Sequence, residues 1–437
     1  KEEMFKKRLT TNAAFLSIIF SGQIEFDRFT IDDGLSQNTV YEVFQDSRGY
    51  IWMGTQGGLD RFNGYEFKQY EHESNDSLSI TEGWIRCIKE DKDGTLWLGT
   101  ANGNFGWFDP YEEIGGEIDL YKDHPGFQRP ARIDKILFHK DYIYLATIGS
   151  GLCRYNKTDD SSTWYMKDST SEHYIKDRVF NDVFSISENE IVFADREITV
   201  LNTETNRHTK PYNQTIEKEL GLPADSLRIS NIALDERGNW YIGTWNSKGL
   251  IVLNIENQTV SQHFPLPPGP ETGERPTARI KEVTLDKSGK VWLSLYNRGI
   301  SIFDPETGEF ENLVPEDENP ASISDHQIES IMKDRSGAMW LGGSRSLMKH
   351  DPEKKKFNLI ASSPRADIQT SFSDFWGLHI DNNESLWGGS VFRGNGAEQI
   401  NLKTKEVIHH IPESAKEGRG VSLWFLREGA EGRIWGR

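Results

Sequence analysis

The sequence predicts an all-β fold built from repeated four-stranded antiparallel sheets, and three observations support this prediction. One phrase recurs, because DSRGYIWMGT begins at residue 46 and DKDGTLWLGT begins at residue 91. The large residue at the centre of the phrase returns at intervals of 45 to 51 residues. Each interval holds four short runs of alternating apolar residues, separated by Gly, Asp and Asn. A repeat of this length with four strands is typical of one blade of a β-propeller.

The repeat can be followed by the residue that takes the place of Trp52. The equivalent positions are Trp52, Trp97, Tyr144, Val192, Tyr241, Trp292, Trp340, Trp387 and Trp435. One blade cannot bury both faces of its sheet, whereas blades arranged radially pack on two neighbours. We therefore expect these residues to fill the space between blades. The Asp and Gly of the preceding turn are expected to be structural too, with the Asp accepting backbone N–H bonds and the Gly adopting positive φ.

The number of repeats predicts one complete ring and the start of another. The run from Ile24 to Thr30 resembles a fourth strand without its first three, and such a strand can complete the last blade and remove two exposed sheet edges. Seven units and this strand predict a seven-bladed propeller over residues 24–360. Residues 361–437 would hold the first blade and part of the next blade of a second propeller, in a fragment of a longer protein. The alternative is a single eight-bladed ring.

Residues 1–23 are predicted to be a signal peptide, or else a disordered or helical tail. Three basic residues, Lys6 to Arg8, precede a short apolar run from Ala13 to Phe20, and the small pair Ser21–Gly22 follows. This order is typical of a secretory signal. The apolar run is too short to span a bilayer by itself.

Composition and motifs limit the classes of function. The formal net charge of −18 makes nucleic acid an unfavourable partner. The only two cysteines, Cys87 and Cys153, are expected to be buried in strands. No spacing of cysteines typical of a metal site, no phosphate-binding loop and no nucleophile motif occurs in the sequence. We therefore predict no cofactor, no metal and no catalytic residue.

The first unit resembles a known repeat family. The lead DGLSQNTV (Asp33 to Val40) and the phrase WMGTQGGLDRF (Trp52 to Phe62) are similar to the first blade of two-component regulator propeller repeats. Those repeats form the periplasmic sensor region of hybrid two-component systems in Bacteroidetes. The resemblance extends over residues 24–437 in repeat form. The third and fourth units depart from the pattern, as do the variants at Trp387 and Trp435.

The resemblance implies a larger parent protein with two successive propellers, an immunoglobulin-like domain, a membrane helix and a cytoplasmic histidine kinase with receiver and DNA-binding modules. It implies a periplasmic location, an oligosaccharide ligand and control of glycan-utilisation genes. The partners implied for this region are the second propeller and the membrane-linked kinase of the same parent chain, with a homodimer allowed in the full-length receptor. Kinase activity is not expected of this chain, because no kinase region is present.

Loops at one end of the propeller are the expected place for a ligand. If the strands of each unit are named a to d, the d–a and b–c loops share one face around the central channel. Aromatic rings stack on the C–H faces of sugars, and Arg donates paired hydrogen bonds to hydroxyls or carboxylates. The candidate ligand-binding residues are Trp84, Trp245, Tyr296, Arg298, His326, Arg345 and Trp376. Arg298 with Arg345 would suit an acidic glycan, although loop residues of this kind also pack on neighbouring loops.

Two other functions remain open from the sequence. A protein-interaction scaffold is a common role of propellers and would show a specific protein partner without affinity for small ligands. A glycan-active enzyme is the other alternative, because the DGTLW turn from Asp93 superficially resembles the Asp-boxes of sialidase propellers. A glycosidase needs two carboxyl groups about 5–10 Å apart. No motif selects such a pair among the 68 acidic residues.

Overall fold

A computed structural model describes residues 24–437 with gaps. The gaps are at residues 82, 125–128, 131, 166–178, 266–277, 317–318, 320, 354–359, 362–367, 372–374, 391–395, 412–422, 424, 430–432 and 437. The predicted signal peptide or tail at residues 1–23 lies outside the described residues. The chain divides into two compact units, the first ending at Pro352 and the second beginning at Glu353.

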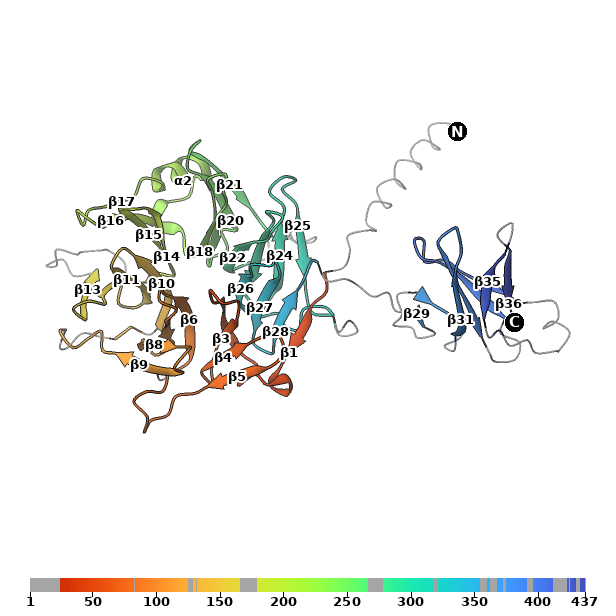
Figure 1. The fold of residues 1–437 in the computed structure, drawn as a ribbon. Coiled ribbons are helices and arrows are strands. Elements are labelled where there is room, and N and C mark those ends of the chain that lie inside the picture. Colours follow the sequence, from red (N-terminus) through yellow and green to blue (C-terminus); the bar gives the residue numbers. More distant parts are fainter. Residues whose placement is uncertain are drawn as a thin grey trace, which may run out of the picture. The chain divides into compact units, whose positions relative to one another are not determined.

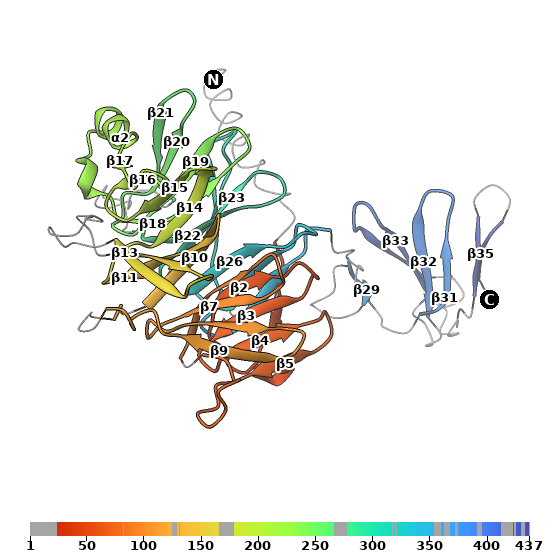
Figure 2. The same ribbon diagram turned by 60° about the vertical axis from the view of Figure 1, so that its left-hand side comes forward.

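The first unit consists of seven four-stranded antiparallel sheets arranged around a common centre (Figure 1, Figure 2). The first strands are β2 (Val40–Gln45), β6 (Ile85–Glu90), β10 (Arg132–His139), β14 (Asp182–Ser187), β18 (Ile229–Leu234), β22 (Ile280–Leu285) and β26 (Ile328–Lys333). The second strands are β3 (Ile51–Thr55), β7 (Leu96–Thr100), β11 (Tyr142–Ile148), β15 (Glu190–Ala194), β19 (Asn239–Thr244), β23 (Val291–Leu295) and β27 (Met339–Gly343).

The outer half of each sheet is formed by its third and fourth strands. The third strands are β4 (Leu59–Phe62), β8 (Phe105–Asp109), β12 (Leu152–Asn156), β16 (Ile198–Asn202), β20 (Leu250–Asn254), β24 (Gly299–Phe303) and β28 (Leu347–His350). The fourth strands are β5 (Phe67–Tyr70), β9 (Ile114–Ile118), β13 (Ser161–Tyr165), β17 (His208–Thr209), β21 (Thr259–His263), β25 (Phe310–Leu313) and, for the seventh sheet, β1 (Asp27–Phe29).

The ring closes through both its inner and its outer strands. Each first strand contacts the first strand of the next sheet, and β26 of the seventh sheet contacts β2 of the first. The outer edge of the seventh sheet is completed by β1, which pairs antiparallel with β28 and sets Phe29 opposite Leu347. The predicted all-β propeller is confirmed.

The helices of the described residues lie outside the sheets. They are the 3-10 helices η1 (Ile31–Asp33) and η2 (Ala224–Ser226) and the α-helix α2 (Asn213–Leu220). The helix α2 lies between β17 and β18 in the chain, and its Ile216 is fully buried against the fourth and fifth sheets. Cys87 in β6 and Cys153 in β12 are free and buried, as predicted.

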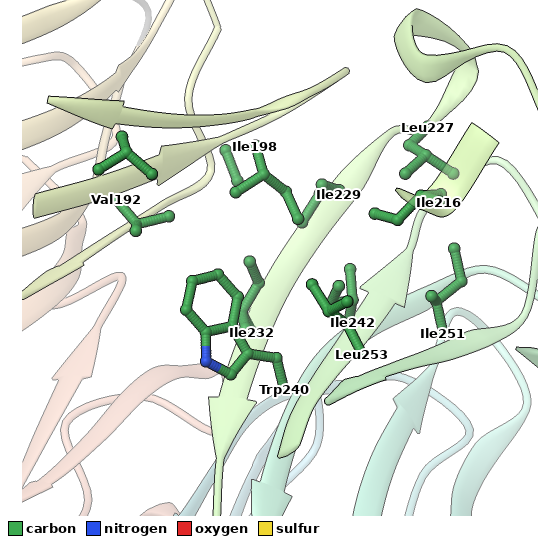
Figure 3. Close-up of a cluster of buried hydrophobic side chains, with 12 residues drawn as sticks. Val192, Ile198, Ile216, Leu227, Ile229, Ile232, Trp240, Ile242, Ile251 and Leu253 are labelled. Carbon is green, nitrogen blue, oxygen red and sulfur yellow. The ribbon is translucent and has the colours of Figure 1, made fainter. Parts of the chain in front are cut away.

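A cluster of buried hydrophobic side chains fills each of the seven spaces between neighbouring sheets. The repeat residues from Trp52 to Trp340 each belong to one of these clusters, so their predicted packing role is confirmed. Figure 3 shows the cluster between the fourth and fifth sheets, where the repeat residue is Val192. Here Trp240 of the fifth sheet supplies the large side chain, which explains why the aromatic residue is dispensable in the fourth unit.

In five of the turns the acidic residue has a second role that the sequence did not predict. One carboxylate oxygen of Asp46 accepts the backbone N–H groups of Arg48 and Tyr50 at 3.0 and 2.9 Å, as expected. The other oxygen accepts the indole N–H of Trp52 at 2.9 Å. Three more pairs share this contact at 2.8 to 3.0 Å, namely Asp286–Trp292, Asp334–Trp340 and Asp381–Trp387. In the fifth sheet the phenol O–H of Tyr241 donates to Asp235 in the same way, at 3.0 Å. One carboxylate therefore ties the turn to the core between two sheets.

The second unit contains one further four-stranded antiparallel sheet and two short strand pairs. The sheet is formed by β31 (Phe375–Ile380), β32 (Ser385–Ser390), β33 (Ala397–Asn401) and β34 (Val407–His410). The pairs are β29 (Ile360–Ala361) with β30 (Ile368–Gln369), and β35 (Leu426–Glu428) with β36 (Ile434–Gly436). Trp387 packs on Ala397, Leu423 and Leu426. Across the described parts of both units, no helix has the length and apolar character needed to cross a bilayer.

Candidate ligand-binding site

A cavity of about 600 Å³ opens at one end of the central channel of the first unit. Six of the seven sheets contribute strand residues to its wall, for example Tyr41, Arg86, Lys135, Asn231, Glu282 and Glu329, and the fourth sheet contributes Asn181 and Asp195, which flank its strands. Trp245 and Tyr296, which follow β19 and β23, also line it. The cavity therefore lies where second strands end and first strands begin, which is the end that carries the b–c and d–a loops. Its volume is typical of sites for small ligands.

The wall of the cavity is built by a bulge that recurs in the first strands. In β2 the pairing with β3 shifts between Val40 and Glu42, so Tyr41 is an extra residue without a partner. The equivalent extra residues in five other sheets are Arg86, Asp134, Ser230, Lys281 and Glu329. All six line the cavity. Bulges change the direction of a side chain and are common beside binding sites, so the backbone presents one variable residue per sheet to the channel.

An aromatic pair stands on one side of the cavity. The rings of Trp245 and Tyr296 meet edge to face, with centroids 5.0 Å apart and an interplanar angle of 65°. The Arg279 guanidinium lies 5.7 and 5.8 Å from these two ring centroids. Backbone hydrogen bonds hold the group in place, because the Trp245 N–H donates to the Arg228 carbonyl at 2.6 Å and the Tyr296 N–H to that of Arg279 at 2.8 Å.

A second aromatic group comes from the first and second sheets. Tyr41 and Trp84 stack with centroids 5.8 Å apart and an interplanar angle of 9°. The guanidinium of Arg86 lies 4.5 Å from the centroid of the Tyr41 ring. Around the ring, the third and fourth sheets lie between the second sheet and the fifth. In the other direction, only the seventh sheet lies between the first sheet and the sixth. The two aromatic groups therefore stand on different sides of the mouth.

Buried charges form the floor of the cavity. Lys135 of the third sheet pairs with Glu282 of the sixth at 3.2 Å across the channel. Burial alone would lower the pKa of Lys135, but Glu282 and Glu42 together raise it above its ordinary value. Burial raises the pKa of Glu42 to about 7, against the opposing effect of Lys135. At neutral pH the floor therefore holds a paired lysine and a carboxyl group that is only partly ionised.

The fourth, fifth and sixth sheets are joined beside this floor by a buried polar network. Asp182 accepts hydrogen bonds from the Asn231 side-chain amide at 3.2 Å and from the Ile232 N–H at 2.7 Å. The Asn231 side-chain oxygen in turn accepts the Val283 N–H at 2.9 Å. Burial raises the pKa of Asp182 to about 6, although Lys135 and the N–H groups act in the opposite direction. This network fixes the angles between neighbouring sheets at the channel wall.

The acidic group of the seventh sheet is also fully engaged. Glu329 pairs with Lys281 of the sixth sheet, with Arg86 of the second sheet at 3.5 Å, and with the Gln327 amide at 2.6 Å. Burial raises the pKa of Glu329, but these partners outweigh it and the net pKa lies below the ordinary value. Glu329 is therefore a charged anchor for two cations at the cavity wall.

The structure brings only part of the predicted set to the cavity. Trp245 and Tyr296 line it, and Trp84, with 42% of its side chain exposed, stacks on a lining residue. Arg298, His326 and Arg345 are exposed and do not line it. The strand order explains the difference, because Tyr296 follows the second strand whereas Arg298 directly precedes the third strand, farther from the axis. Arg298 and Arg345 therefore stand apart from this cavity, and their use for an acidic glycan stays a prediction.

His326 and Trp376 also lie away from the cavity, and the structure explains the position of each. The carbonyl of His326 accepts the N–H of Gly299, at the start of the third strand of the neighbouring sheet. Trp376 belongs to the second unit, where it is the extra residue of a bulge in β31 and has 62% of its side chain exposed. It occupies the position in its own sheet that Tyr41 occupies in the first sheet.

Sequence reasoning missed the bulged residues, although a signal for them exists. In the six bulged strands, two residues separate the first two apolar positions, as in VYEV at Val40, IRCI at Ile85 and IKEV at Ile280. Strict alternation would leave one residue between them. The interruption of the alternation marks the residue that turns toward the channel. Arg228 and Arg279 were also missed, because they directly precede the strands β18 and β22 and lie in no recognisable motif.

A second groove, of about 650 Å³, lies at the opposite end of the fifth and sixth sheets. Turn residues such as Arg237, Asp286 and Lys333 line it, together with Leu234. The pair Arg237–Glu306 at its rim is 3.8 Å long, and both side chains are more than three-quarters exposed. Exposed pairs of this kind contribute little, and the groove has no aromatic pair, so we do not treat it as the ligand site.

Comparisons with known proteins agree with the geometry of the repeats. Residues 34–57 and 79–102 match the family model described as Two component regulator propeller. These two segments therefore match two-component regulator propeller repeats. The matched segments include β2 and β6, so the phrases that mark the first two sheets are those of the repeat family. A segment of 71 residues, 16% of this chain, is 42% identical to Histidine kinase P4 of Formosa agariphila and covers 5% of that protein.

Solved structures share the propeller fold. The extracellular domain of the hybrid two component system BT3049 from B. thetaiotaomicron matches with a TM-score of 0.64 and 18% identity, over 94% of this chain and 52% of that one. The chain thus spans about half the length of that domain. Virginiamycin B lyase from Staphylococcus aureus matches with a TM-score of 0.54 and 13% identity, over 75% of this chain and 99% of that one. At such identities these likenesses show the fold alone, which both a receptor domain and an enzyme can use.

Proposed function

We propose that this chain is an extracytoplasmic ligand-binding module of a hybrid two-component histidine kinase and that its ligand is an oligosaccharide. The parent protein would carry the kinase and the membrane segment, and binding would regulate glycan-utilisation genes. The likeness to extracellular domains of hybrid two component systems supports the receptor role. The role of this chain in that receptor is to hold the ligand, without turnover.

The observation that carries the proposal is the Trp245–Tyr296 pair at the mouth of a 600 Å³ cavity. Tyr296 is 39% exposed, so its ring is open to a ligand. Aromatic rings bind the C–H faces of sugars, while charged and amide groups in the wall can bind the hydroxyls. The cavity joins all seven sheets, so a ligand there can favour one arrangement of the sheets over another.

The experiment is a thermal-unfolding screen of the 437-residue chain against oligosaccharides of plant, animal and microbial origin. A ligand that binds only the folded state raises the unfolding midpoint, and a concentration of 100 times Kd stabilises the fold by about 2.7 kcal/mol. We expect one class of glycan to raise the midpoint. Chromatography of the ligand after incubation should show it intact, whereas cleavage products would support the enzyme alternative.

A pair of matched variants locates the site. Tyr296→Ala should weaken binding in calorimetry about tenfold or more, because it removes half of the aromatic pair. Tyr65→Ala is the control, since Tyr65 is 96% exposed in the turn before β5 and lies outside the cavity. Equal affinities of both variants and the parent chain would contradict the proposed site. No midpoint shift with any oligosaccharide would contradict the proposed function.

A further inference from the structure

We propose that the oligosaccharide carries a negatively charged group, a carboxylate or a sulfate, that is bound by Arg228 and Arg279 beside the Trp245–Tyr296 pair. This inference rests on the proposed function and names the chemical class of the ligand. It is based on the charges around the cavity. The acidic side chains there have partners within the protein, whereas two arginines have no carboxylate partner among the described residues.

The formal charges of the cavity wall balance. Its lining includes five basic residues, Arg86, Arg132, Lys135, Arg228 and Lys281, and five acidic residues, Glu42, Asp134, Asp195, Glu282 and Glu329. This balance differs from the rest of the chain, which has a formal net charge of −18. The wall is therefore less negative than the chain as a whole, which favours an anion there over an average site on the molecule.

The acidic groups of the wall are occupied by partners within the protein. Asp134 pairs with Arg132 at 2.7 Å, and Glu282 pairs with Lys135 at 3.2 Å. Glu329 holds both Lys281 and Arg86. Asp195 is buried and has an interaction of its own. Burial favours the protonated form of Glu42, so this fifth acid adds less than a full negative charge near neutral pH.

Two arginines at the mouth have no such partner among the described residues. Arg228 lines the cavity and is exposed, and no ion pair or side-chain hydrogen bond joins it to another described residue. Arg279 does not itself line the cavity, but it is exposed beside two lining rings and has no carboxylate partner within the described part of the chain. Its contacts are the rings of Trp245 and Tyr296, which orient the guanidinium without neutralising its charge.

The backbone fixes both arginines next to the aromatic pair. Arg228 and Arg279 occupy the same position, directly before the first strand, in the adjacent fifth and sixth sheets. Their carbonyl groups accept the N–H groups of Trp245 and Tyr296, so the backbone of each arginine is held beside one residue of the pair. A sugar stacked on these rings would meet the Arg279 guanidinium, which already contacts both rings, and Arg228 would reach it from the adjacent fifth sheet. Guanidinium groups bind carboxylates and sulfates through paired hydrogen bonds.

The test uses ligands that differ only in charge. The 437-residue chain is titrated by calorimetry with oligogalacturonides and with the same oligosaccharides after methyl esterification, which removes the carboxylate charge. Sulfated galactan oligosaccharides and their desulfated counterparts form the second pair. We expect at least one anionic member to bind tenfold or more tightly than its uncharged counterpart, and the pair that shows the difference identifies carboxylate or sulfate as the group.

Variants connect the difference to the two arginines. Arg228→Gln and Arg279→Gln should each weaken binding of the anionic member about tenfold, and should leave the uncharged member almost unchanged. Arg237→Gln is the matched control, because it lies in the fifth sheet at the opposite end of the channel. Raising the salt concentration should weaken only the anionic member. All variants remove exposed side chains, and an unchanged unfolding midpoint verifies that they fold.

Four outcomes overturn the inference. If the uncharged members bind as tightly as the anionic ones and their binding depends on Tyr296, the ligand needs no charged group, and the proposed function still stands. Loss of anion binding in Arg237→Gln to the same extent would show a general charge effect. If no member of either pair binds but a neutral oligosaccharide from the thermal screen does, the inference of a charged ligand fails and the proposed function stands. If no oligosaccharide binds at all, both the inference and the proposed function fail.

Discussion

The carboxylate of Asp334 accepts the indole N–H of Trp340 at 2.9 Å through one oxygen and the backbone N–H groups of Ser336 and Ala338 through the other. Both side chains are buried, the indole within the cluster between the seventh and first sheets. The turn and the core of the blade are therefore held by a single ionised group. The same indole contact recurs in two other sheets of the ring and in the second unit, and the Tyr241 O–H replaces the indole N–H in the fifth sheet.

Asp334→Ala should lower the free energy of unfolding by about 2–4 kcal/mol, because it leaves a buried indole N–H and two turn N–H groups without an acceptor. Chemical denaturation measures the loss. Asp91→Ala is the comparison, since Asp91 stands in the equivalent turn of the second sheet, where the indole N–H of Trp97 has no hydrogen-bond partner. A much smaller loss is expected there. Equal losses in the two variants would show that the contact with the indole contributes nothing.

The same carboxylate predicts a loss of stability in acid. Burial raises the pKa of Asp334, but the hydrogen bonds from Ser336, Trp340 and Ala338 outweigh it and hold the pKa below its ordinary value. The unfolded chain then binds more protons than the folded one near pH 3–4, so this stabilisation is present above the ordinary Asp pKa of about 3.9 and is lost as pH falls. Asp334→Asn should show a shallower decrease of the unfolding midpoint between pH 5 and pH 3. Parallel decreases would contradict the assignment.

Glu42 predicts the opposite pH dependence. Burial raises its pKa to about 7, so between the ordinary Glu pKa of about 4.3 and pH 7 the folded chain binds the extra proton. The contribution of Glu42 to stability therefore decreases as pH rises through this window. Glu42→Gln should raise the thermal midpoint at pH 8 by a few degrees and change it little at pH 4. A lower midpoint at pH 8 would show that the charged form of Glu42 is favourable through Lys135.

The closing strand β1 is predicted to stabilise the whole ring. Phe29 lies 5.3 and 5.9 Å from the ring centroids of Phe62 and Phe67 in the first sheet and 6.1 Å from that of Trp340 in the seventh. Phe29→Ala should cost about 2–3 kcal/mol, near the lower end for a phenylalanine because the side chain is only partly buried. Chemical denaturation tests this, with Tyr65→Ala expected to be neutral. If Phe29→Ala is neutral as well, the closing strand does not hold the ring together.

Most of the fold could be predicted because its determinants repeat. The repeat residues from Trp52 to Trp340 recur at nearly constant spacing, and each lies in a space between sheets. Val192 follows the same physics, since Trp240 of the neighbouring sheet supplies the missing volume. Trp435, which is 63% exposed, does not fill such a space, so the prediction is wrong at that position. The register across β1 and β28 required coordinates, because it depends on contacts between residues more than 300 positions apart.

The site was predicted only in part. The end of the channel followed from strand order, and Trp245 and Tyr296 were found there. Arg298 and Arg345 lie too close to the third strands to line the cavity. Their loops are only three residues long, and position in such a loop did not reveal that Tyr296 faces the cavity whereas the arginines do not. The bulged residues such as Tyr41 and Lys281 were not predicted, because each lies within a strand and the strand residues of a propeller were expected to be structural.

Hydrogen–deuterium exchange of the 437-residue chain, with and without the oligosaccharide that gives the largest thermal shift, tests the central claim most directly. We expect slower exchange in residues 228–232, 243–246 and 279–283, which form the aromatic side of the cavity mouth. We expect no change in the turns of residues 235–238 and 286–289, at the opposite end of the same sheets. Protection confined to those turns would contradict the placement of the ligand at the cavity.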